Sequence, residues 1–177
     1  MLKTIRNYFT VKLTPLIRYL HYSILLLVLL QIILSNFIEI NDEGVIGQNL
    51  IENYSTWAHI SIGLLLVVLA LAFTMIELSK HGLSYFYPYL SGDITQITSD
   101  LRKLKSLQIP DASPKGLAAV IQGLGIGALL LVVLSGATWF ILWSYNPTQA
   151  SDAKEFHEIF TGLIEVYVIG HGGMGLI

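Results

Sequence analysis

Two histidines in the last apolar stretch of the chain are its strongest candidates for chemistry. They are His157 and His171, and both lie in the 22 residues Phe156–Ile177. As a helix this stretch is about 33 Å long, enough to cross a bilayer. Fourteen steps of about 100° bring both rings to one face, but the rings are about 21 Å apart along the axis. They cannot bind the same metal ion, so we expect two separate sites, each completed by another helix.

The composition indicates an integral membrane protein. Of the 177 residues, 54% are hydrophobic and 12% are charged, whereas a soluble domain is about 25% charged. The chain has no cysteine, which excludes disulfides, Cys-ligated zinc, iron–sulfur clusters and haem attached through a CxxCH motif. Histidine is therefore the expected ligand for any buried metal. The first hydrophobic run is long enough to remain in the membrane instead of being cleaved as a signal peptide.

The hydrophobic runs predict an all-α fold, a four-helix membrane bundle that forms a single domain over residues 1–177. We expect Ser55 or Thr56 to cap the second helix, and Asp152 with Glu155 to form a capping box for the fourth. The third helix contains several glycines and no histidine, which is typical of a close-packing helix. The four spans are expected at residues 16–37, 57–77, 117–143 and 156–177.

The connection between the second and third spans, residues 78–116, is predicted to carry an amphipathic helix at the cytoplasmic membrane surface. Asp93 resembles a helix cap, and Asp100 is expected on a face away from the apolar residues. A helix that packs against a partner protein would show the same pattern, and this alternative stays open. Residues 1–15 also fit a short interfacial helix. The apolar residues of the connection recur three and four apart, at Ile94, Ile97, Leu101, Leu104 and Leu107.

The distribution of Lys and Arg predicts the topology. Four of these residues lie in the N-terminal segment and five in the 78–116 connection. The loop between the first two spans has none, and the loop between the last two has only Lys154. Because positive loops stay in the cytoplasm, both termini are predicted to be cytoplasmic. The protein is expected to cross the bacterial inner membrane several times.

Helix direction then assigns a depth to each histidine. His59 and His157 lie near the external side, and His21 and His171 near the cytoplasmic side. Two facing neutral imidazoles are the ligand set of a low-spin b-type haem, whereas zinc usually requires four ligands. Gly63, four residues after His59, leaves room for a flat group beside the ring, although close helix packing would favour the same glycine. Two histidines bound to one haem iron leave no open axial position on that iron, which favours electron transfer over oxygen binding.

The segments around these histidines resemble those of the bacterial di-haem cytochrome b-561 family. They read RYLHYS at His21, WAHISIG at His59, and FHE followed by GHGG in the last span. The family consists of four-helix membrane cytochromes related to the cytochrome b subunits of hydrogenase and formate dehydrogenase. The resemblance implies two b-type haems with the four histidines as axial ligands. It also implies electron transfer between quinone and a second redox partner.

The chain departs from the family at several positions. Tyr22 stands where members often have Trp, and Phe73 with apolar neighbours stands where compact members carry an Arg. Arg18, one turn before His21, is the substitute candidate for a haem propionate contact. Members usually end in a basic tail, so the sequence is expected to continue beyond Ile177.

The sequence therefore predicts a di-haem cytochrome that exchanges electrons between an external donor or acceptor and the quinone pool. Its expected partners are membrane lipid and quinone, and no nucleic acid. The alternative is the membrane anchor and electron conduit of a larger respiratory complex, with a periplasmic redox protein or a dehydrogenase subunit as partner. Whether the chain is itself a quinone oxidoreductase depends on this choice. A third class is a metal or solute transporter that uses histidines in transit.

Two further ionisable residues have no assigned role. His81 is expected at the cytoplasmic surface, where it either binds quinone or a proton or is an interfacial residue. Glu165 is expected in the middle of the last span, where an ionised carboxylate would be costly. It either transfers protons or forms a neutral hydrogen bond.

Overall fold

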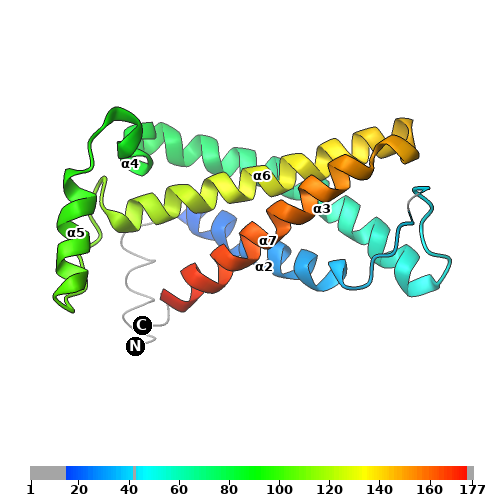
Figure 1. Cartoon of the computed structure of the whole chain (residues 1–177), viewed down its shortest axis with the longest axis horizontal. Coiled ribbons are helices and arrows are strands. Elements are labelled where there is room, and N and C mark those ends of the chain that lie inside the picture. The colour runs from blue at the N-terminus through cyan, green and yellow to red at the C-terminus, as the bar shows by residue number, and fades with distance from the viewer. Residues whose placement is uncertain (1–14, 42, 175–177) are drawn as a thin grey trace. The chain divides into compact units, whose positions relative to one another are not determined.

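The structure, a computed structural model, describes residues 15–41 and 43–174, and these are almost entirely helical (Figure 1). The all-α prediction is confirmed, and the one backbone pairing of the strand type in the described ranges is an isolated bridge between Ile40 and Ile46. The short helix predicted over residues 1–15 lies outside the described residues, apart from Pro15. The elements are α2 (Pro15–Ser35), α3 (Leu50–His81), α4 (Leu83–Phe86), η1 (Pro88–Ser91), α5 (Thr95–Lys105), α6 (Leu117–Tyr145), η2 (Pro147–Gln149) and α7 (Ser151–Met174).

Three helices of the described chain are long and apolar enough to cross a membrane, namely α2, α3 and α6. They agree with the first three predicted spans and support a membrane protein. Helix α7 has 24 residues, but it is not among the three because its polar content is higher. Its role as a fourth span therefore stays a prediction. The charged residues of α7 are Asp152, Lys154, Glu155, Glu158 and Glu165.

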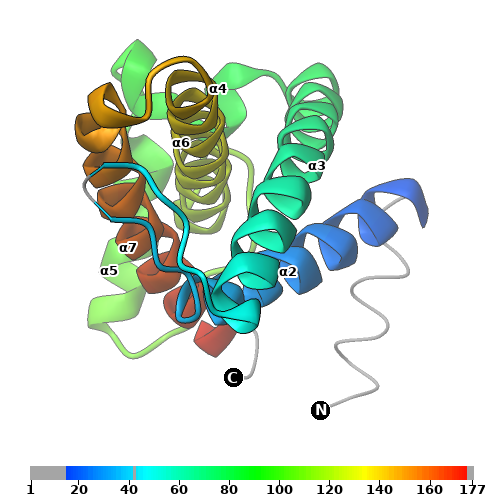
Figure 2. The ribbon, with the colours of Figure 1, turned by 90° about the vertical axis from the view of Figure 1, so that its right-hand side faces the viewer.

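The chain divides into two compact units, one from Met1–Phe73 with Ala128–Ile177 and the other from Thr74–Gly127. In the first unit, α2 lies beside α3, and α6 lies beside α7 (Figure 2). All four helices contribute to one buried apolar cluster, so the unit has a shared core. The cluster consists of Ile24, Val28, Leu66, Ala70, Ala128, Leu129, Val133 and Ile164.

Helix α3 begins seven residues before the predicted start, so the cap expected at Ser55 or Thr56 is wrong. Asn49 forms the cap instead, because its side-chain Oδ1 accepts a hydrogen bond from the backbone N–H of Ile51 at 3.0 Å. The Glu52 carboxylate accepts one from the backbone N–H of Asn49 at 3.4 Å. This reciprocal pair is a capping box. Thr56 is buried inside the helix and donates its hydroxyl proton to the Glu52 carbonyl at 2.7 Å.

Two other predicted caps are displaced as well. Helix α7 starts at Ser151, so Asp152 lies inside its first turn and does not cap it. Pro147 begins the preceding turn η2 and sets a helical φ there, so the chain turns into α7 before Asp152. Helix α5 starts after Ile94, one residue beyond the predicted cap. The carboxylate of Asp93 still accepts a hydrogen bond from the Thr95 N–H at 3.4 Å.

The loop before α3 packs on the end of α6 in the first unit. The indole N–H of Trp143 donates to the carbonyl of Gly44 at 2.8 Å, and Trp143 stacks on Trp139 at a centroid distance of 5.6 Å. Gly44 has φ +76° and lies against Pro147, where a side chain would collide. This contact fixes the loop, which contributes two residues to the cavity described below.

In the second unit, the aromatic segment Ser84–Tyr89 packs on a glycine of α6. The hydroxyl of Tyr87 donates to the carbonyl of Gly123 at 2.6 Å. A Cβ atom on Gly123 would lie 2.8 Å from the Cβ of Phe86, which is 1% exposed. Gly123 therefore allows the aromatic segment to approach the backbone of α6 closely.

The amphipathic pattern predicts Asp100 on an outer face of α5. This prediction is wrong, because Asp100 is buried and only 1% exposed. Its carboxylate accepts hydrogen bonds from the Leu117 backbone N–H at 2.8 Å and from the Gln96 side chain at 2.9 Å. The N–H of Leu117 is one of the unpaired donors at the start of α6. Asp100 therefore caps α6 from a different helix and stabilises its positive end.

We expect Asp100→Ala to lower the free energy of unfolding by about 1–3 kcal/mol, because buried donors lose their partner. Hydrogen exchange at the Leu117 amide should accelerate, and thermal unfolding in detergent should occur at a lower temperature. Asp111→Ala is the matched control, since the Asp111 side chain is 96% exposed beside Lys103. Equal exchange at the start of α6 in both variants would contradict the cap.

Candidate functional site

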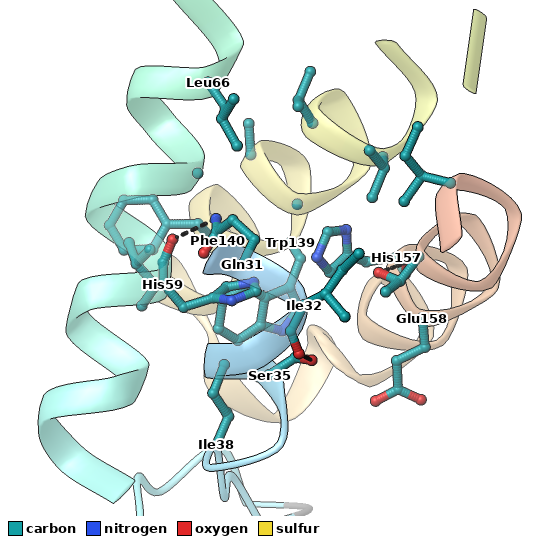
Figure 3. Close-up of a pocket in the computed structure, with 18 of the residues that line it drawn as sticks. Gln31, Ile32, Ser35, Ile38, His59, Leu66, Trp139, Phe140, His157 and Glu158 are labelled. Atoms are coloured by element: carbon teal, nitrogen blue, oxygen red, sulfur yellow. Dashed lines mark hydrogen bonds between the residues drawn. The ribbon is translucent and has the colours of Figure 1, made fainter. Parts of the chain in front are cut away.

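The first unit brings the rings of His59 on α3 and His157 on α7 together in an edge-to-face arrangement (Figure 3). Their ring centroids are 6.2 Å apart and the ring planes meet at 77°. Both rings line a cavity of about 440 Å³. Glu158 follows His157 in the chain and points away from the two rings (Figure 3). The structure thus brings together the two histidines that the sequence places at the external depth.

Helix α2 holds the backbone of α3 at His59. The side-chain amide of Gln31 donates to the carbonyl of His59 at 2.9 Å (Figure 3). A Cβ atom on Gly63 would lie 3.0 Å from the same amide nitrogen. Gly63 lines the cavity and also permits this close contact with α2, while its place beside a flat group stays a prediction. The ring Nδ1 of His59 is buried and has no hydrogen-bond partner among the described residues, so a ligand could satisfy it.

Helix α6 has no histidine, but it orients the ring of His157. The hydroxyl oxygen of Ser135 lies 3.1 Å from the His157 Nδ1 and 3.0 Å from the Val132 carbonyl. When the hydroxyl proton is donated to the Val132 carbonyl, the Ser135 oxygen accepts from His157 in the tautomer that carries its proton on Nδ1. In this tautomer the neutral imidazole has no proton on Nε2. The lone pair of Nε2 is left available to a metal.

Gly136, the next residue of α6, makes space for the same ring. A Cβ atom there would lie 2.8 Å from the Cε1 of His157 and 3.2–3.3 Å from its two nitrogens. Any larger residue would displace the ring from its present position. Ser135 and Gly136 were missed from the sequence, where the only signal is a small polar pair within an apolar run.

The cavity walls are mostly apolar, with a few polar groups. Trp139 and Phe140 lie on one side, and Ile38 and Ile40 of the preceding loop contribute to the cover. The Lys154 ammonium lines the cavity and donates to the carbonyl of Ile40 at 3.4 Å. Such a pocket, apolar with few polar groups, is typical of a cofactor site. Its polar lining also includes Gln31, Ser35, Thr56, Glu158, Thr161 and Glu165.

The other two predicted histidines also meet. The ring centroids of His21 on α2 and His171 on α7 are 6.4 Å apart, with planes at 66°. Tyr167 stacks on His171 at 5.1 Å, nearly parallel. Phe73 lies 6.3 Å from the His21 ring. Tyr167 was not anticipated from the sequence, although it precedes His171 by one helical turn.

The predicted propionate partner Arg18 lies one turn before His21 on α2. Its guanidinium lies 5.6 Å from the centroid of the Tyr19 ring, in a cation–π arrangement. Arg18 is half-buried. The structure therefore places it on the same helix as His21, while its role stays a prediction.

His81 and Glu165 belong to neither histidine pair. The ring of His81 lies 4.6 Å from that of Tyr85, and its Nε2 is 3.8 Å from the Glu77 carboxylate. Glu165 is half-buried and lines the large cavity. Over residues 15–41 and 43–174, no group of three or more His, Cys, Asp or Glu residues could hold a metal ion. A metal in this part of the chain would therefore have to bring its own further ligands, as haem does.

The two ring separations fit a metal ion midway between the imidazoles. A metal–nitrogen bond is about 2 Å and each nitrogen is about 1 Å from its ring centre, so the centroids should lie about 6 Å apart. Rings in edge-to-face contact can reach the same distance. The additional observations at the external pair are the cavity, the space at Gly136 and the Nε2 lone pair of His157. The residues at this pair therefore fit an axially ligated haem.

A comparison with protein families identifies the family of this chain. Residues 12–177 match the family described as prokaryotic cytochrome b561. No curated protein and no solved structure matches the chain at a significant level. Because the match covers nearly the whole sequence, the chain belongs to the prokaryotic cytochrome b561 family and is a membrane b-type cytochrome of electron transfer.

Proposed function

We propose that the protein transfers electrons across the bacterial inner membrane between two b-type haems. In this proposal His59 and His157 ligate the external haem, and His21 and His171 ligate the cytoplasmic one. The observation that carries the proposal is the presence of two facing histidine pairs with one member of each on α7. Their similar centroid separations, 6.2 and 6.4 Å, suit one type of ligation at both places.

A haem iron with two imidazole ligands supplies one-electron redox chemistry without an open coordination position. The residues of the chain provide the setting. Ser135 keeps the proton on the Nδ1 of His157, and the apolar cavity walls exclude water. Lys154, which lies 3.8 Å from the Glu158 carboxylate, is the proposed cation for a propionate at the external site, and Arg18 is its counterpart at the cytoplasmic site. Helix α7, as a fourth span, completes a four-helix bundle.

The proposed electron route connects an external donor or acceptor with the quinone pool. A second candidate is the membrane anchor and electron conduit of a larger complex. It is favoured by the compact fold of the Thr74–Gly127 unit, which is larger than a simple connection requires and could contact another subunit. Purification in mild detergent distinguishes the two, since an anchor should co-purify with a dehydrogenase or periplasmic redox subunit.

Substitution of the histidines should remove the haems in pairs. His59→Ala and His157→Ala should each abolish the same spectral component, because both ligate one iron. His21→Ala and His171→Ala should abolish the other. The double variant of His59 and His157 should retain about one haem per chain, like each single variant, because both changes act on one site. Haem content and low-temperature α-band spectra measure these outcomes.

Loss of the same component in His59→Ala and His171→Ala would contradict the pairing. Purified protein without a Soret or α band after reduction would overturn the haem assignment and leave the transporter alternative. His81→Ala is the control, since His81 packs with Tyr85 and not with another histidine, and its haem content should be unchanged.

Ser135→Ala should weaken haem retention at the external site. Loss of an orienting hydrogen bond typically reduces the metal affinity of a histidine site by about 10–100-fold. The rate of haem loss to an acceptor protein should rise for one component only. Ser144→Ala is the matched control on α6, because Ser144 is exposed and its hydroxyl donates to the Phe140 carbonyl. If both variants lost haem at the same rate, Ser135 would have no orienting role.

The proposed depths of the haems depend on topology. A reporter inserted within residues 41–48 should behave as external, and one within residues 111–115 as cytoplasmic, because the positive charges concentrate in the N-terminal segment and the 78–116 connection. An enzymatic reporter that is active on only one side of the membrane measures this. The opposite pattern would exchange the inner and outer assignments.

A further inference from the structure

Helix α5 packs on the protein through its polar side. The buried carboxylate of Asp100 bonds both Gln96 and the start of α6. A Cβ atom on Gly116 would also lie 2.6 Å from that carboxylate, so the chain before α6 approaches Asp100 closely. These contacts fix the rotation of α5 about its own axis. An ordinary surface helix has the opposite arrangement, with its apolar side packed and its polar side exposed.

The apolar side of α5 is largely exposed as a consequence. Leu101 and Leu104 are 45% and 42% exposed, Ile94 and Leu107 at the two ends of the helix are 51% and 96% exposed, and Ile97 is half-buried. With about 100° per residue, the apolar stripe points roughly at a right angle to the direction of Asp100. Helix α5 also runs across the direction of the first turns of α6 (Figure 1). Because α6 is apolar enough to span a membrane, a helix in this orientation lies along the membrane plane.

Two cations border the exposed stripe. Arg102 and Lys105 lie along the edge of the stripe that is farther from Asp100. Neither residue forms an ion pair with the described residues. Lys103 faces another direction and lies 3.7 Å from the Asp111 carboxylate. An apolar stripe with cations along one border matches the chemistry of a bilayer surface that carries negative headgroups.

We propose that α5 is a binding surface for anionic phospholipids. In this arrangement Leu101 and Leu104 enter the acyl region, while Arg102 and Lys105 contact headgroup phosphates. The buried Asp100 bond holds the stripe toward the bilayer, so α5 and the start of α6 are anchored to each other and to the leaflet. The surface requires no haem and can be tested separately from the histidine pairs.

The absence of cysteine makes a site-specific test direct. The full chain carries a nitroxide label at Leu104→Cys or, as a control on the solvent side, at Ser106→Cys. Each protein is placed in nanodiscs of phosphatidylcholine alone or mixed with anionic phosphatidylglycerol. Collisions with oxygen and with a water-soluble nickel chelate measure the depth of each label. The label at position 104 should sink into the bilayer as phosphatidylglycerol is added, and the label at 106 should stay in water.

The charges can be tested on the same labelled protein. Arg102→Gln with Lys105→Gln should require several-fold more phosphatidylglycerol for the same depth, since each cation near an anionic surface contributes about a five-fold factor. Lys103→Gln is the matched control and should behave like the parent, because it removes one charge from the same helix away from the stripe border. Far-ultraviolet circular dichroism and size-exclusion profiles of all variants verify that they remain folded.

Three results would overturn the proposal. The first is a label at 104 that stays accessible to the nickel chelate in every lipid. The second is a label that sinks to the same depth without phosphatidylglycerol, which would mean apolar insertion without headgroup binding. The third is a label protected from both reagents, which would mean that a protein partner or a second copy covers α5.

Discussion

Each imidazole pair brings together two groups that are unfavourable alone in an apolar interior. A neutral histidine has one donor and one acceptor, and burial is costly unless both are satisfied. At the external pair the donor of His157 is satisfied by Ser135, and the acceptor faces His59 across the cavity. A metal ion between the rings would satisfy the acceptors of both residues. The rest of the first unit is arranged so that these rings meet.

The sequence of α6 follows from this requirement, although that helix has no histidine. Gly136 is needed because the ring of His157 lies against its backbone. Gly123 is needed because Phe86 and Tyr87 lie against its backbone in the second unit. Each glycine faces a ring from another element. Gly123 and Gly136 are therefore two separate places where another element approaches the backbone of α6 closely. Larger residues between them, such as Leu129 and Val133, join the apolar core.

Several features of this arrangement could be predicted from the sequence. The helical spacing of the histidines, the distribution of Lys and Arg, and the direction of each helix are sufficient to match His59 with His157 and His21 with His171. The structure brings these same rings together. Their role as ligands, the fourth span and the topology stay predictions.

The contributions of Ser135 and Asp100 could not be predicted from the sequence. A serine in a helix can bond its own backbone, and an acid in an amphipathic helix is normally exposed, so only the tertiary contacts reveal their roles. The sequence does contain the capping-box pattern Asn-x-x-Glu at Asn49 and Glu52. Ser55 and Thr56 are preferred as caps from the sequence because they lie closer to the start of the apolar run.

The polar content of α7 has a consequence for biogenesis. A segment with five acidic or basic residues besides its two histidines partitions poorly into lipid when it leaves the translocon alone. If α7 is the fourth span, as proposed, it needs α2, α3 and α6 already in place to receive His157, Glu165 and His171. Membrane integration of the last helix would then coincide with cofactor capture, so a shortage of haem would leave the C-terminal segment poorly inserted and exposed to quality-control proteases.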